Sequence, residues 1–312
     1  MAYGSAACKG NPDARPDAIP VISEALKAEL TFVPAGMEVL VRLDLTGLAA
    51  QDPEAVGMLE FLLRAQQPAA GEVMDAAGLK LGRDVRALLF AARAPAGKAE
   101  APDGDALIAV VGSFDGDVIA EHVAAKTGMP AETADGGRLF IWHEGAEHAF
   151  GSAEHEPGER DQPVAIGVTD GLVVLGGPRL VKDALAVRSR GGEPLGVALA
   201  VDVALAPAGS LAWGAARGAG VATLAREVAP GLLGARFHAA AGSTKDHRAA
   251  IALRAEFDTV DQASAFQVRL TAFIAQAAAL AGTRGLGATL AKLRDQGAVK
   301  RRMKVVEIVG AL

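Results

Sequence analysis

The sequence predicts an α+β protein made of two tandem related units, each a mainly antiparallel sheet with helices packed on one face. Two observations carry this prediction. The strongest short hairpin signal, Asp170-Gly171, separates two apolar strand segments, and hairpins join antiparallel neighbours. The order strand–helix–strand–strand–helix–strand also occurs twice along the chain, which is typical of a repeated architecture.

The composition is that of a folded protein. The 312 residues include 68 alanines and only 4% are aromatic, so Leu, Val and Ile must form the core with Ala as filler. No run of apolar residues is long enough to cross a bilayer as a helix. The net charge of −6 argues against a nucleic-acid-binding protein, because phosphate contacts need a basic surface. The dense basic run at 300–304 fits a polar edge strand better than a phosphate-binding track.

Residues 1–34 are predicted to form an N-terminal tether with a short helix, and residues 35–192 form the first unit. Within it, Asp52-Pro53-Glu54 starts a helix, because Asp suits the N-cap, Pro the first turn and Glu the helix dipole. Asp115 starts another helix directly after an apolar strand. The predicted strands are 38–45, 86–93, 106–112, 138–143, 163–168 and 172–176. The predicted helices are 52–66, 68–77, 115–126 and 179–188.

Residues 193–312 form the second predicted unit. Phe257-Asp258 ends a strand and starts a helix there, as Phe114-Asp115 does in the first unit, and both aspartates are expected to cap their helices. The predicted strands are 211–213, 236–241, 249–257 and 303–308, and the helices are 195–205, 221–228, 258–281 and 288–295. The sheets of the two units either stand apart or join edge to edge, which would remove an exposed edge strand.

The lone cysteine, Cys8, has the context of a lipidation site. Small residues precede it and a polar, proline-containing spacer follows, which resembles the end of a bacterial lipoprotein signal whose Cys is acylated. We therefore expect a signal peptide that is truncated in this sequence. Lys9 and Gly10 favour the periplasmic face of the outer membrane, because Asp in the second position is the usual inner-membrane retention signal. The alternative is an incidental exposed thiol on a cytoplasmic protein.

Several segments are similar to a loosely defined group of uncharacterised bacterial proteins, many of them predicted lipoproteins of myxobacterial type. They are Val33-Pro34, residues 38–45, residues 111–115, Asp170-Gly171, residues 176–178 and Phe257-Asp258. The resemblance is one of pattern and composition. It implies a cell-envelope address and a two-unit fold, and it implies no chemistry.

A loop at 143–159 is rich in His and Glu. His143, Glu147, His148 and His155 are donors that suit a divalent metal such as Zn²⁺ or Ni²⁺, and a loop can fold around one ion. The spacing is not that of the zinc-protease helix, which needs two histidines four residues apart. The alternative interpretation is a solvated acidic connection between strands.

Residues 214–220 are similar to the glycine-rich turn of short-chain dehydrogenases, which holds a dinucleotide pyrophosphate at a helix N-terminus. Those enzymes also need a downstream Tyr-x-x-x-Lys pair, and the only tyrosine here is Tyr3. A small-residue helix start is the better interpretation, so no cofactor is predicted. No residue is predicted to be catalytic.

The sequence therefore favours a non-enzymatic, lipid-anchored binding or structural protein of the cell envelope. Its predicted partner is an unidentified protein or an apolar ligand held between the two units, and the predicted membrane contact is made only through a lipid anchor at Cys8. The alternative function is divalent-metal binding by the loop at 143–159.

Overall fold

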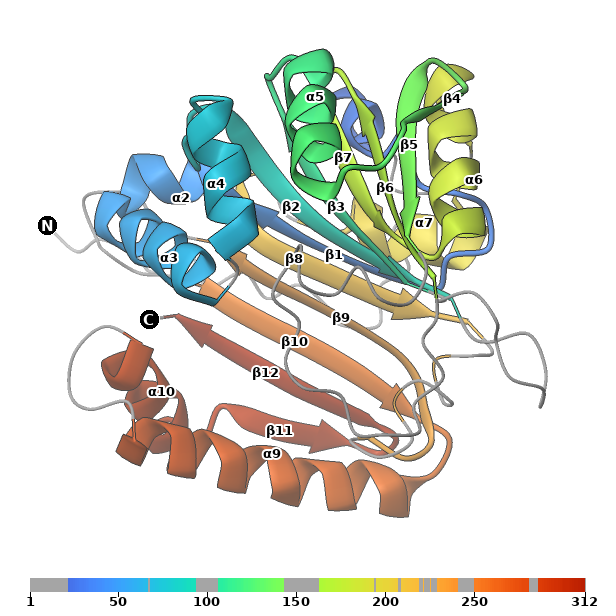
Figure 1. Ribbon diagram of the computed structural model, residues 1–312. Helices are drawn as coiled ribbons and strands as arrows, with labels where there is room; N and C mark the ends of the chain where they lie inside the picture. Colours follow the sequence, from blue (N-terminus) through green and yellow to red (C-terminus); the bar gives the residue numbers. More distant parts are fainter. Residues whose placement is uncertain are drawn as a thin grey trace, which may run out of the picture.

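The computed structural model describes residues 22–66, 68–93, 106–142, 163–193, 195–206, 209–218, 221, 225, 229–240, 250–280 and 286–311. Within them, one large antiparallel sheet carries packed helices, which confirms the predicted α+β class (Figure 1). The strands are β1 (Val39–Asp44), β2 (Val85–Ala92), β3 (Ala106–Gly112), β4 (Glu132–Ala134), β5 (Gly137–Trp142), β6 (Val164–Thr169), β7 (Leu172–Gly176), β8 (Ser210–Arg217), β9 (Leu232–Ala240), β10 (Ala250–Phe257), β11 (Val299–Arg302) and β12 (Val305–Ala311). The helices are α1 (Glu24–Glu29), α2 (Leu45–Gln51), α3 (Pro53–Gln66), α4 (Pro68–Ala76), α5 (Gly116–Thr127), α6 (Pro178–Ser189), α7 (Val197–Ala204), α9 (Val260–Leu280) and α10 (Leu286–Asp295).

The sheets of the two predicted units join edge to edge into a 12-stranded sheet with the order β11-β12-β10-β9-β8-β1-β2-β3-β7-β6-β5-β4. The first strand of each unit forms the junction, since β1 and β8 pair antiparallel with Leu40 opposite Ala215. The core crosses this junction as well. Trp213 of β8 and Leu199 of α7 belong to the same apolar cluster as Leu40 and Leu180. The tandem relation between the two units, and their boundary at residue 192, stay predictions.

In the first half of the chain, helices cover both faces of the sheet. The side chains of Leu139 and Phe140 on β5 point to opposite faces, and both are fully buried. Leu139 packs in the cluster that contains Leu180 of α6, and Phe140 packs with Ile119 of α5. We call these two sides the α6 face and the α5 face. The prediction of helices on one face is wrong for this half, because strands with continuous apolar runs, such as β6, need cover on both sides.

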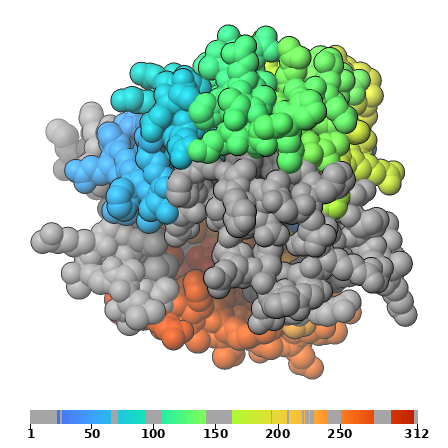
Figure 2. All heavy atoms as spheres, in the orientation of Figure 1, coloured from blue at the N-terminus to red at the C-terminus, as the bar shows by residue number. Residues whose placement is uncertain are grey.

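In the second half, the helices α9 and α10 cover the α5 face. Ile274 of α9 and Leu293 of α10 pack against Ile308 of β12, and Phe266 lies with the fully buried Phe257. Figure 1 shows α2–α5 gathered along one part of this face and α9 and α10 along the other, and the space-filling view shows the same separation (Figure 2). The one-face prediction therefore holds for α9 and α10 but not for α7 (Val197–Ala204), which packs on the α6 face with Trp213 of β8.

The two helices that follow Phe-Asp pairs begin differently. The Asp115 carboxylate accepts hydrogen bonds from the amides of Asp117 and Val118 at 2.9 and 3.4 Å, so the predicted cap of α5 is confirmed. At α9 the cap is Thr259, whose hydroxyl accepts from the Gln262 amide at 3.2 Å while the Gln262 side chain accepts from the Thr259 amide at 3.1 Å. The prediction of Asp258 as the cap is wrong by one residue, because Thr and Gln form a capping box here.

The basic run at 300–304 begins in β11, which is an edge strand as predicted, and turns at Met303 with a positive φ of 52°. Among the described residues, no helix is both long and apolar enough to cross a membrane.

Candidate ligand pocket

The predicted lipidation and metal residues lie outside the described residues. These residues are Cys8, His143, Glu147, His148 and His155. Within the described ranges, no group of three or more His, Cys, Asp or Glu side chains is placed to hold a metal ion. Lipidation and metal binding therefore stay predictions.

The glycine-rich segment that begins at Gly214 does not form a nucleotide-binding turn. Residues 213–217 are extended in β8, where Gly214 lies opposite Val41 of β1 and Phe237 of β9. A Cβ atom on Gly214 would lie 2.2 Å from the Phe237 ring, so the glycine is explained by the space that this ring occupies. The match to a dehydrogenase turn is contradicted over these residues; Ala219 and Gly220 fall outside the described part.

The pocket that we favour as the functional site lies in the first half, beside α1 and at the junction of β3 and α5. Its volume is about 570 Å³. The lining comes from α1, β2, the β3–α5 junction, the β6–β7 turn and the end of α6. The residues are Ala28, Glu29, Arg86, Val111, Gly112, Ser113, Phe114, Asp170, Gly171 and Arg188. Two of the segments recognised in the sequence, 111–115 and 170–171, thus meet at one site.

Backbone hydrogen bonds fix that meeting. The Gly112 amide donates to the Gly171 carbonyl at 2.9 Å, and the Gly171 amide donates to the Phe114 carbonyl at 3.0 Å. The Asp170 carboxylate accepts from the Gly116 amide at 2.9 Å. Gly171 has a φ of +68°, which is the conformation that the predicted turn requires and that glycine adopts without strain. These bonds therefore hold the β3–α5 junction and the β6–β7 turn together at the pocket.

A similar pair of bonds occurs in the second half. The Phe257 amide donates to the Lys304 carbonyl in the β11–β12 turn, and the Asp258 amide donates to the Gly231 carbonyl, both at 2.9 Å. In the first half, Gly112 donates to the β6–β7 turn in the same way, and the Ser113 amide donates to the Asp84 carbonyl at 2.7 Å. In each half, hydrogen bonds thus join a hairpin turn to the end of the strand that precedes a helix. This helix is α5 in the first half and α9 in the second.

The charged side chains of the pocket differ in how they are paired. Glu29 is held by Arg42, whose Nε and Nη2 donate to its two carboxylate oxygens at 2.6 and 3.0 Å. Among the described acceptors, Arg86 donates to the Gly112 carbonyl, at 3.2 Å, and Arg188 donates to the Ala28 carbonyl and the Thr31 hydroxyl. Among the described residues, no carboxylate lies within ion-pair distance of Arg86 or Arg188. Within the described part of the chain, the pocket therefore presents two cations without an acidic partner.

A second group of charges lies on the α6 face of the second half, and here the charges satisfy one another. Asp202 of α7, whose side chain is only 5% exposed, accepts from Arg217 at 2.7 Å and from Arg236 at 3.5 Å. Arg217 also contacts Glu256 at 3.2 Å. Burial lowers the pKa of Arg217, but the hydrogen bonds and negative charges of Asp202 and Glu256 together raise this pKa by more, so it lies above its usual range. We regard this cluster as structural.

Two histidines lie in the elements predicted for them. His122 is on α5, with a buried Nε2 that has no hydrogen-bond partner among the described residues. His238 is on β9, and burial, followed by the positive charge of Arg236, lowers its pKa. Neither lines the pocket.

Sequence reasoning did not identify Arg86 and Arg188. Arg86 begins a predicted strand and Arg188 ends a predicted helix, so both look like ordinary solvated charges. The only available signal was indirect: the segments at 111–115 and 170–171 stood out by their pattern, and they line the pocket into which these arginines project.

Comparison with known proteins gives a limited result. No protein-family model matches the chain, and no curated protein matches it. Two solved structures of TP0453 are similar in fold. Crystal form III has a TM-score of 0.49 at 9% identity and covers 90% of this chain and 92% of its own. Crystal form I has a TM-score of 0.46 at 10% identity and covers 90% and 91%.

Proposed function

We propose that this chain is a non-enzymatic binding protein of the cell envelope, anchored through an acylated Cys8 at the periplasmic face of the outer membrane. The observation that carries the binding role is the pocket of about 570 Å³ with two arginines that have no acidic partner among the described residues. A cavity of this size with a few convergent polar groups is typical of a small-molecule site. All of its lining residues lie between residues 28 and 188, so this ligand binds within the first half of the chain.

The binding role is tested by blocking the pocket. Ser113 is exposed at the pocket lining, so Ser113→Trp should fill the space, while Thr271→Trp on the exposed side of α9 serves as the control. The native chain and both variants are purified from the native host, denatured, and analysed by mass spectrometry for small molecules that they release. We expect the native chain and Thr271→Trp to release the same compound and Ser113→Trp to release none. Equal release from all three would contradict the proposal.

The anchor is tested separately. The full gene product should incorporate labelled palmitate in the native host, and Cys8→Ser should abolish the incorporation. An unlabelled protein that fractionates with the cytoplasm would refute the address and leave the pocket as a site in a different compartment.

A second candidate is a protein or apolar partner on α3. Met58, Phe61 and Leu62 are 66%, 69% and 45% exposed, and they recur at helical spacing on the outer side of this helix. Exposed apolar patches of this kind mark interaction surfaces. A photo-crosslinker at position 58, with position 271 on α9 as the control, should give one discrete adduct in cells. Equal adducts at both positions would argue against a partner at α3.

A further inference from the structure

We propose that the pocket binds the oxyanion of an organic ligand, a carboxylate or a phosphate, through Arg86 and Arg188. This inference rests on the proposed binding function and names the chemical class of the ligand. Its basis is the contrast between these two guanidinium groups and the arginines that are paired with carboxylates, such as Arg42 and Arg217.

Within the described ranges, most of the N–H donors of both arginines have no acceptor. A guanidinium carries five N–H donors. Arg86 uses one of them on the Gly112 carbonyl, and Arg188 directs its Nη1 at the Ala28 carbonyl and the Thr31 hydroxyl. These acceptors are neutral, so they orient the groups without cancelling their charge. Carboxylates and phosphates match the planar fork of a guanidinium, which makes an oxyanion the ligand group that fits best.

The acidic residues of the lining are engaged elsewhere. Glu29 is bound at both oxygens by Arg42, which lies outside the lining. Asp170 directs an oxygen to the Gly116 amide at the start of α5. The lining thus holds two arginines and two carboxylates, but the carboxylates have cationic or amide partners while neither guanidinium is paired with a described carboxylate. In the second half, by contrast, Arg217 and Arg236 share the buried Asp202.

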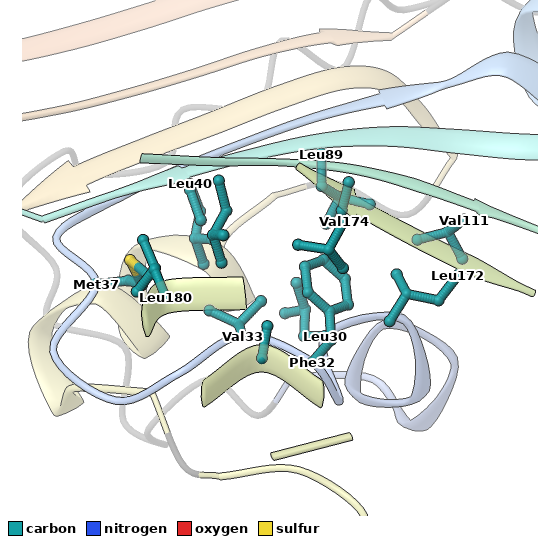
Figure 3. Close-up of a cluster of buried hydrophobic side chains, with 14 of the residues drawn as sticks. Leu30, Phe32, Val33, Met37, Leu40, Leu89, Val111, Leu172, Val174 and Leu180 are labelled. Atoms are coloured by element: carbon teal, nitrogen blue, oxygen red, sulfur yellow. The ribbon is translucent and has the colours of Figure 1, made fainter. Parts of the chain in front are cut away.

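The pocket also has an apolar wall. Val111 and Phe114 line it, and Val111 belongs to the main core cluster of the first half. Figure 3 shows Val111 and Leu172 side by side at one end of that cluster. A ligand whose oxyanion meets the arginines can therefore place a short apolar chain against Val111 and Phe114.

The predicted tether would keep the pocket within a limited distance of the membrane. The chain from Cys8 to Glu24 of α1 spans at most about 55 Å when fully extended, and α1 itself lines the pocket. An anchored protein would thus hold the pocket near a membrane surface. The oxyanion is carried either by a free solute or by a lipid headgroup, and the experiment separates these two sources.

Binding is measured by titration calorimetry on the full chain with octanoate, octanamide and inorganic phosphate. Arg86→Gln and Arg188→Gln are compared with Arg269→Gln, which removes the same charge from an exposed position on α9. Circular dichroism confirms that each variant is folded. We expect octanoate to bind at least tenfold more tightly than octanamide, and each pocket variant to weaken octanoate by about tenfold, as for a lost charged hydrogen bond. Arg269→Gln should bind like the native chain.

Two comparisons, solute binding and vesicle flotation, identify the source of the anion. Arginine-dependent binding of octanoate or inorganic phosphate supports a free solute. Arginine-dependent flotation with phosphatidylglycerol vesicles, and none with phosphatidylcholine vesicles, supports a headgroup. Failure of octanoate, phosphate and anionic vesicles to bind overturns the proposal, as does equal binding by Arg86→Gln, Arg188→Gln and Arg269→Gln.

The same measurements separate failure of the oxyanion proposal from failure of the proposed binding function. If octanamide binds as tightly as octanoate and Ser113→Trp abolishes both, the pocket remains a ligand site and the oxyanion class is wrong. If Ser113→Trp binds octanoate like the native chain, the pocket is not the site, and the proposed function fails with it.

Discussion

The two halves of the sheet differ in what covers their α6 face. In the first half this face is sealed by α6, and Ala109 in the middle of β3 is 1% exposed. In the second half the same face carries Arg236, Arg254 and Glu307 on neighbouring strands, and Ala252 of β10 is only half-buried. The comparison shows that one continuous sheet can be a fully buried apolar layer at one end and a half-buried, charged layer at the other.

The strand sequences explain the difference. Residues 165–168 of β6 are all buried, as in a strand packed on both faces. In β10, Ile251, Leu253 and Ala255 face α9 while Arg254 and Glu256 face the other side. This alternation is typical of an antiparallel strand with one wet face. The period of the apolar residues thus decides whether a strand needs one helix layer or two.

The sharpest test places the same charge in both halves. Ala109→Asp should destabilise the protein by more than about 4 kcal/mol or prevent folding, because it buries a carboxylate without a partner. Ala252→Asp should cost about 1 kcal/mol or less, because this position is only half-buried and Arg254 lies on the same face of the strand. Urea denaturation measures both. Similar losses at the two positions would contradict the distinction between a sealed and an open face.

The next largest loss of stability is expected at Asp202, which lies between the apolar and the charged parts of the α6 face. Asp202→Ala should cost about 2 kcal/mol, less than a fully buried pair, because Arg217 and Arg236 are partly exposed and can reach water. Glu256→Ala, at a side chain that is 43% exposed, should cost less than about 0.5 kcal/mol. Chemical denaturation compares the two, and equal costs would mean that Asp202 is not the centre of the cluster.

The helix caps give a smaller contrast between the halves. Asp115→Ala and Thr259→Ala should each cost about 1 kcal/mol, because each removes the acceptor of an N-terminal helix amide. Asp258→Ala should have almost no effect on stability. Thermal unfolding of the three variants tests this, and a loss at Asp258 that matches the loss at Thr259 would restore Asp258 as the cap.

The smallest expected effect is the pH dependence of His238. Burial and the charge of Arg236 lower the pKa of His238 in the folded chain, so the unfolded chain binds the proton more tightly. The native chain should therefore lose stability relative to His238→Gln as the pH falls from 7.5 through about 6.5, the ordinary pKa of the unfolded imidazole. Measurements at pH 7.5 and 5.5 stay above the range in which Asp84 titrates, since its hydrogen bond to Arg83 lowers its pKa. A constant difference between the two proteins would contradict the prediction.

Much of the local structure was predictable from short segments. The turn at Asp170-Gly171, the cap at Asp115 and the edge position of residues 300–302 depend on neighbours in the chain, and each was found as predicted. The short strand β4 and the strand β11 were not predicted as separate elements, because three or four residues carry too little periodicity to stand out.

The sequence by itself determined the α+β class, the antiparallel pairing and the position of most strands and helices, because turn residues and apolar periodicity act over a few residues. Only the tertiary structure decided that β1 and β8 join the two sheets, that α6 seals one end of a face, and that Arg86 and Arg188 meet at one pocket. These outcomes depend on contacts between segments far apart in the chain. Arg188 reaches Thr31 across 157 positions, and no local pattern records that contact.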